Sequence, residues 1–208
     1  NERPGLTGLA HLFEHLMFEG SAHQPYGYFP PLQEAGASLN GSTSTDRTNY
    51  WEVVPTNALE LALWMESDRM AFLLPALTEA KFSNQRDVVL NERRQNYENR
   101  PYGMAGLAML DAIYPDWHPY HWSTIGSPDD LRAATADDVR AFFRRYYHPA
   151  NASLAIAGDT DADRALDLAA SYFGEIPAGD RPAPVPPAPT SANRSRRVIE
   201  DRVELPRL

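Results

Sequence analysis

Apolar side chains recur at helical spacing in several separate segments of the chain. The first predicted helix covers 6–19, where Thr7 is suited to cap its start and Gly20 stands where a helix should stop. Its apolar positions are Leu9, Phe13, Leu16 and Met17. Further helices are predicted over 57–74, 79–99, 102–114, 135–147 and 161–173, with a short one inside 26–36.

Three other segments have the composition of strands. Residues 37–45 are mostly small and polar, and 47–54 carry Tyr50 and Trp51, so the two are predicted to form a hairpin. Residues 152–157 read Ala-Ser-Leu-Ala-Ile-Ala and are closed by Gly158, which predicts a short buried strand. Strands that alternate with helices favour an α+β or α/β sandwich.

A proline-rich segment near the end of the chain separates two predicted domains. We predict a first domain over 1–175, a stiff linker over 176–194 and the start of a following domain over 195–208. The first predicted helix has no strand or lead-in before it, so we also expect a truncated N-terminus. The linker prolines are Pro177, Pro182, Pro184, Pro186, Pro187 and Pro189.

Charge and cysteine content narrow the function. The net charge is −9, from 28 acidic and 19 basic side chains. Such a chain lacks the basic surface that nucleic-acid binding requires. No apolar run approaches the roughly 20 residues that cross a bilayer, so no membrane span is expected. The chain has no cysteine, which leaves histidine and carboxylate side chains as the plausible metal ligands.

Such ligands occur together in the first predicted helix, in the order His-x-x-Glu-His. His11 and His15 are four residues apart, so both imidazoles project from one face of a helix and can reach one ion. Glu14 lies on the flank of that face, near the open position of a metal, where it could take a proton from water. The alternative is a purely structural helix whose histidines lie at the edge of the core and bind no metal.

A catalytic zinc site needs a third protein ligand, and Glu92 is the candidate. It lies in the predicted helix 79–99, whose Val88 and Val89 are expected to face inward, so the carboxylate one turn later can face an interior site. A glutamate on a helix is more often a solvated surface charge.

The residues in this order resemble the pitrilysin and insulin-degrading metallopeptidases, peptidase family M16, the inverted zincins. Landmarks from residue 5 to about 174 match in family order. They are Gly5 to Ala10, His11 to His15, Leu39 to Thr43, Thr48 to Tyr50, Val88 to Glu92, Ile125-Gly126, Tyr146 to Asn151 and Gly158-Asp159. The resemblance implies an α+β fold in which a mostly antiparallel sheet packs against helices. It also implies that His11, His15 and Glu92 bind Zn²⁺ and that Glu14 is the base.

The same resemblance gives the first predicted strand a role. Asn40, Gly41, Ser42 and Thr43 would pair with an extended peptide substrate by backbone hydrogen bonds. The alternative is an ordinary polar hairpin. One departure concerns Gln85, because many relatives have a second glutamate at this position, seven residues before Glu92. An amide can accept a hydrogen bond but carries no charge, so ligand orientation or proton handling could differ.

The predicted function is therefore that of a zinc-dependent metalloendopeptidase acting on peptides or small unfolded polypeptides. By resemblance, a homologous second half or a sister subunit completes the active site with Tyr and Arg side chains. The alternative is a non-catalytic partner or scaffold subunit of the same family. An exported, periplasmic location is favoured over a cytoplasmic one.

Other histidines and aromatic residues are assigned to packing. His118 and His121 are three residues apart in a proline-broken loop, which favours loop packing over a second metal site. His23 and His148 are expected at the surface or in loops. One aromatic group at helical spacing is expected in the core, with Arg144 and Arg145 toward solvent. Its members are Phe142, Phe143, Tyr146 and Tyr147.

Overall fold

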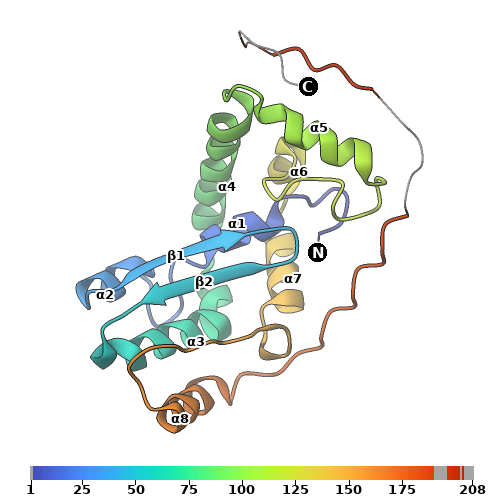
Figure 1. Cartoon of the computed structure of the whole chain (residues 1–208). Helices are drawn as coiled ribbons and strands as arrows, with labels where there is room; N and C mark the ends of the chain where they lie inside the picture. Colours follow the sequence, from blue (N-terminus) through green and yellow to red (C-terminus); the bar gives the residue numbers. More distant parts are fainter. Residues whose placement is uncertain (1, 190–195, 202, 204–208) are drawn as a thin grey trace.

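The computed structural model describes residues 2–189, 196–201 and 203 (Figure 1). Its elements are α1 (Leu9–Leu16), α2 (Phe29–Glu34), β1 (Ser38–Thr43), β2 (Thr48–Val53), α3 (Leu59–Ala76), α4 (Glu79–Arg93), α5 (Gly103–Ile113), α6 (Pro128–Ala133), α7 (Ala136–Tyr146) and α8 (Ala162–Phe173). Single helical turns cover Thr56–Ala58, Arg94–Glu98 and Pro149–Asn151. The predicted helices are therefore confirmed, with α1 shorter at both ends.

The two strands form the predicted antiparallel hairpin. Ser38 pairs with Val53 at one end and Thr43 pairs with Thr48 at the other. Ser44 donates its backbone N–H to the carbonyl of Arg47 at 2.8 Å, which closes the turn. The hairpin passes in front of α1, and α4 stands beside α1 (Figure 1).

The main core forms where α1 meets α4, α6 and α7. Leu12, Phe13 and Leu16 of α1 are each at most 1% exposed. Burying one such side chain contributes about 1.5–3 kcal/mol. The buried face of α1 lies against Phe82 and Val89 of α4. Three of the four predicted aromatic residues pack around Phe13, namely Phe142, Phe143 and Tyr147. This packing fixes the face of α1 that carries the two histidines.

The start of α1 is capped differently from the prediction. Thr7 does not cap the helix, because its hydroxyl donates to the Asp130 carboxylate at 2.6 Å. The carboxylate of Glu2 takes the capping place, accepting from the backbone N–H groups of Gly8 at 2.9 Å and Ala10 at 2.7 Å. A carboxylate there complements the positive end of the helix dipole.

A buried cation ties the hairpin to α3. Arg69 is 1% exposed, and its Nε donates to Glu66 at 3.0 Å. Its guanidinium lies 3.9 Å from the ring centroid of Tyr28 and 4.3 Å from that of Tyr50. Tyr50, on β2, also shares a hydrogen bond of 2.9 Å with Tyr147 after α7. The Arg69 guanidinium of α3 thus contacts Tyr50 on β2 and Tyr28 just before α2, and these contacts hold the hairpin against α3.

One prediction about the fold is wrong and another is not confirmed. The segment 152–157 is extended but forms no strand, and Leu154 is 50% exposed. A strand needs a neighbour for its backbone groups, and within the described residues the hairpin is the only sheet and pairs only with itself. The predicted sandwich is therefore not seen there, whereas a mixed fold with an antiparallel sheet is. Helix α6 was not predicted.

The proline-rich segment runs as extended chain along the outside of the molecule (Figure 1). The predicted linker 176–194 is described only as far as 189, and most of the predicted following domain, 195–208, lies outside the described residues. The division into domains stays a prediction. Among the described helices, none is long and apolar enough to cross a membrane.

Candidate metal centre

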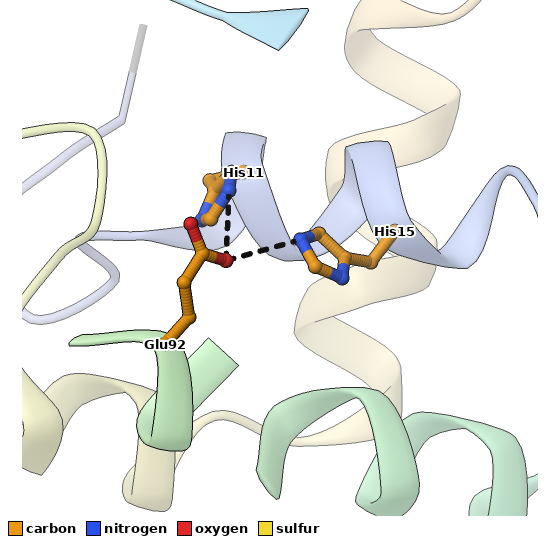
Figure 2. A group of neighbouring side chains, drawn as sticks. All are labelled: His11, His15 and Glu92. Atoms are coloured by element: carbon orange, nitrogen blue, oxygen red, sulfur yellow. Dashed lines mark ion pairs between the residues drawn. The ribbon is translucent and has the colours of Figure 1, made fainter. Parts of the chain in front are cut away.

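His11 and His15 of α1 point toward the carboxylate of Glu92 on α4 (Figure 2). The Nε2 atom of His11 lies 3.6 Å from Glu92 Oε2, and that of His15 lies 3.5 Å from the same oxygen. One ligand atom from each residue lies within 4.8 Å of the others, and no other group of this kind occurs among the described residues. The structure thus brings together all three predicted metal ligands.

Helix α4 places Glu92 through its buried face. Phe82 and Val89 are at most 1% exposed and Leu90 is 8% exposed, all packed on the core that α1 shares. Val88 was expected to face inward, but it is 39% exposed. Leu90 faces inward instead of Val88, because helical geometry puts residues 82, 89 and 90 on one side of the helix. Glu92 then lies on the edge of that side, facing α1.

The chemistry of these donors fits a zinc ion. Two imidazole nitrogens and one carboxylate oxygen are a ligand set of catalytic zinc sites, and they leave a fourth position open. Burial lowers the pKa of His11, although the nearby Glu92 carboxylate opposes this. A lowered pKa keeps the imidazole neutral, which is the form that binds metal.

Glu14 lines the same cleft as His11 and Glu92 but does not belong to the cluster of predicted ligands. Its side chain is buried, with the residue 8% exposed, and it accepts a hydrogen bond from the Thr43 hydroxyl at 2.5 Å. Burial raises the pKa of the Glu14 carboxyl, and the Thr43 hydrogen bond opposes that rise. A carboxylate with a raised pKa beside a metal position is suited to accept a proton and pass it on.

Gln85 is a partner of the second histidine. Its side-chain oxygen lies 3.2 Å from Nδ1 of His15, and its amide N–H donates to the carboxylate of Glu19. The amide oxygen can only accept, so His15 carries its proton on Nδ1 and presents Nε2 toward Glu92. The neutral Gln85 therefore orients His15, and the nearest negative charge in this chain of contacts is the Glu19 carboxylate, which Gln85 contacts in turn.

The predicted substrate strand borders the cleft. The cleft has a volume of about 290 Å³ and includes Gly41, Ser42 and Thr43 of β1. Asn40 does not line it, and its side chain accepts from the N–H of Gly41 at 2.8 Å. Ser42 donates to Asn49 at 2.6 Å. A role in binding peptide stays a prediction for all four residues.

Sequence reasoning missed part of the cleft wall. Tyr97 and Thr124 line the cleft beside His11 and Glu14, and Ile125, known only as a family landmark, lines it too. Tyr97 follows α4 in the π-helical turn, whose place could not be deduced from periodicity. Thr124 belongs to the loop before α6, and no spacing pattern marks it.

His118 and His121 are packing residues, as predicted. His118 is 3% exposed and stacks on Tyr114, and His121 pairs with Asp111 at 3.0 Å. His148 lies in a loop, as predicted, and is buried there. His23 is exposed on its loop and contacts a buried acid, Asp68.

The fold and the site have the arrangement of the inverted zincins, in which a His-x-x-Glu-His helix is completed by a glutamate from a later helix. A family model described as Insulinase (Peptidase family M16) matches residues 1–114, and one described as Peptidase M16 inactive domain matches 133–208. The chain belongs to peptidase family M16.

Individual relatives agree with this assignment. The zinc protease PqqE of Helicobacter pylori is 34% identical over 177 residues, which cover 85% of this chain and 39% of that protein. The crystal structure of a protease from Helicobacter pylori is similar with a TM-score of 0.82 and 32% identity, over 91% of this chain and 45% of that one. The periplasmic protease PqqL from Escherichia coli has the same fold, with a TM-score of 0.79 and 24% identity, over 92% of this chain and 22% of its own.

These matches also show how the length of the chain compares with that of its relatives. It spans less than half the length of the curated relatives it matches, at 39%, 38% and 44% of three of them. The activity of a whole protein of this family therefore enters only as a proposal.

Proposed function

We propose that this chain is the zinc-binding part of a metalloendopeptidase that hydrolyses peptides or small unfolded polypeptides. The observation that carries the proposal is the convergence of His11, His15 and Glu92 at the edge of a cleft that His11 and Glu92 line together with a buried carboxylate, Glu14. Relatives that are named zinc proteases support zinc as the metal.

Each residue of the cleft has a distinct task in this proposal. His11, His15 and Glu92 hold the ion, which when bound lowers the pKa of a water molecule to about 7 and polarises a peptide carbonyl. Glu14 accepts the proton of the attacking water and returns it to the leaving amine. Residues 40–43 of β1 align the peptide as an added strand beside this centre.

A second half is part of the proposal. The cleft includes no Arg side chain and only one tyrosine, Tyr97, among the described residues. Stabilisation of the oxyanion by a further donor is worth about a hundredfold or more in rate, so a donor from a homologous half or sister subunit would matter. The lengths of the relatives leave room for such a half.

A second candidate is a non-catalytic partner subunit. The match of residues 133–208 to the family model described as an inactive domain favours it, as does Gln85 in place of a carboxylate. Retention of His11, Glu14, His15 and Glu92 favours the enzyme, because a partner has no need of them. An exported location also stays a prediction, since PqqL, whose title calls it periplasmic, is 24% identical.

The test compares the complete protein with Glu14→Gln and with the isolated chain, using a quenched peptide and metal analysis. Glu14→Gln should keep zinc and lose cleavage by about 100-fold or more, because only the base is removed. The isolated chain should hold zinc and cleave slowly. Equal cleavage by Glu14→Gln would rule out Glu14 as the base, and rapid cleavage by the isolated chain would rule out the need for a second half.

A further inference from the structure

Thr43 lies at the end of β1 and connects the hairpin to the helix that carries the candidate base. Its hydroxyl donates to Oε2 of Glu14 at 2.5 Å, a hydrogen bond between residues 29 positions apart. Glu14 is buried and Thr43 is half-buried, so water competes little for this bond. A hydrogen bond to a carboxylate is among the stronger types in proteins.

The neighbouring strand extends that hydrogen bond by one more hydroxyl. Thr48 pairs with Thr43 across the hairpin, and their hydroxyl oxygens are 3.2 Å apart. A threonine hydroxyl has one proton and can also accept. Because Thr43 gives its proton to Glu14, Thr48 is left to donate to Thr43. The resulting chain runs from Thr48 through Thr43 to the carboxylate.

The backbone of β1 confines the same carboxylate from another side. A Cβ atom placed on Gly41 would lie 2.9 Å from Oε1 of Glu14 and 3.1 Å from the ring of Phe18. The strand therefore passes so close to Glu14 that a side chain at position 41 would displace the carboxylate end. One oxygen of Glu14 lies against the strand backbone, and the other is held by Thr43.

We propose that the side chain of Thr43 positions the base Glu14 and does not contact the substrate. This inference rests on the proposed function, and it changes the role expected for Thr43 from the sequence. A glutamate side chain has several rotamers, and catalysis needs the one that places its oxygen within hydrogen-bond reach of the reacting proton. The Thr43 hydroxyl selects that rotamer, while Asn40, Gly41 and Ser42 remain the proposed peptide-binding positions.

The main experiment measures kcat and KM for the complete, zinc-loaded protein carrying Thr43→Val or Thr43→Ser. Valine keeps the shape and removes the hydroxyl, whereas serine keeps the hydroxyl. We expect Thr43→Val to lower kcat about 10- to 100-fold with KM within about twofold, because a small misplacement of a reacting group costs this much. Thr43→Ser should restore most of kcat. Thr43→Ala, which removes the hydroxyl without a branched side chain, should behave as Thr43→Val.

A second readout does not depend on turnover. In zinc-loaded Glu14→Gln protein, a fluorescent peptide should bind with the same Kd, within about twofold, whether position 43 is threonine or valine. Zinc content should also be equal. A raised KM or a weaker Kd at unchanged kcat would make Thr43 a substrate contact and overturn the inference, as would an unchanged kcat in both Thr43→Val and Thr43→Ala. Wild-type protein that holds zinc and cleaves no peptide would instead overturn the proposed function, and this inference with it.

Discussion

Gln85 illustrates how a neutral side chain can orient a predicted metal ligand. A ligating histidine is normally oriented by an acceptor on its other ring nitrogen. Here the acceptor is the amide oxygen of Gln85, 3.2 Å from His15 Nδ1, and the amide N–H is satisfied by Glu19. The ring orientation is kept, while the partner itself is neutral. In contrast, Nδ1 of His11 is buried without a hydrogen-bond partner among the described residues.

The first prediction at this scale concerns Gln85→Leu. Loss of the acceptor should weaken zinc binding about 10- to 100-fold, because His15 is then free to turn or to adopt the other tautomer. Competition with a coloured chelator measures the affinity. Gln85→Glu is the matched control, since it keeps an acceptor at the same place and should bind zinc more tightly than Gln85→Leu. Equal affinity of Gln85→Leu and wild type would show that Gln85 does not orient the ligand.

Some residue roles could be predicted from the sequence and others could not. His11 and His15 follow from a four-residue spacing on a helix, and the contact with one carboxylate confirms their convergence. Glu92 needed the family resemblance, because a lone glutamate on a helix carries no spacing signal. The contact between Thr43 and Glu14 depends on how the hairpin lies on α1, which local sequence does not determine.

At the scale of elements, the loop before α6 fixes the start of α1 against α4. Gly126 has φ 72°, and its carbonyl accepts from the buried Arg93 of α4 at 2.8 Å. A Cβ there would lie 2.4 Å from both the Cα of Gly8 and the carbonyl oxygen of Thr7. Such a contact is between backbone atoms, which cannot turn away as a side chain can. The two ligand-bearing helices are thus joined through a site that requires glycine.

Gly126→Ala is therefore expected to lower the free energy of unfolding by about 2 kcal/mol, through positive φ and the backbone clash. Urea unfolding of the isolated chain measures it. Gly106→Ala is the control, because Gly106 lies inside α5 with open space around its Cα. That change should leave stability the same or raise it by about 0.5 kcal/mol. A smaller loss for Gly126→Ala than for Gly106→Ala would contradict this account of the loop.

The elements differ in how well periodicity predicts them. The helices follow from apolar spacing, and the hairpin follows from its composition. Helix α6 has only six residues, too few for a periodic pattern, although Ser127 followed by Pro128 marks its start. The strand predicted at 152–157 has suitable residues but does not form. A strand needs a neighbouring strand to pair with, and none lies there among the described residues.

At the scale of the whole molecule, the chain carries a complete set of proposed metal ligands beside an open cleft. His11, His15 and Glu92 come from two helices of one core, so the site does not depend on the proposed second half to assemble. The chain covers less than half of its relatives, which is consistent with a site held here and closed by chain from elsewhere. Metal binding and rapid cleavage should therefore be separable properties.

The most direct measurement is the zinc content of the purified chain by mass spectrometry after equilibration with zinc and removal of the excess. The wild type and Glu14→Gln should each hold about one zinc per chain, because the three ligands are intact. His15→Ala should hold almost none, whereas His121→Ala, which changes a histidine outside the cleft, should still hold one. Wild-type chain without zinc, or His15→Ala with as much zinc as wild type, would contradict the proposed metal centre.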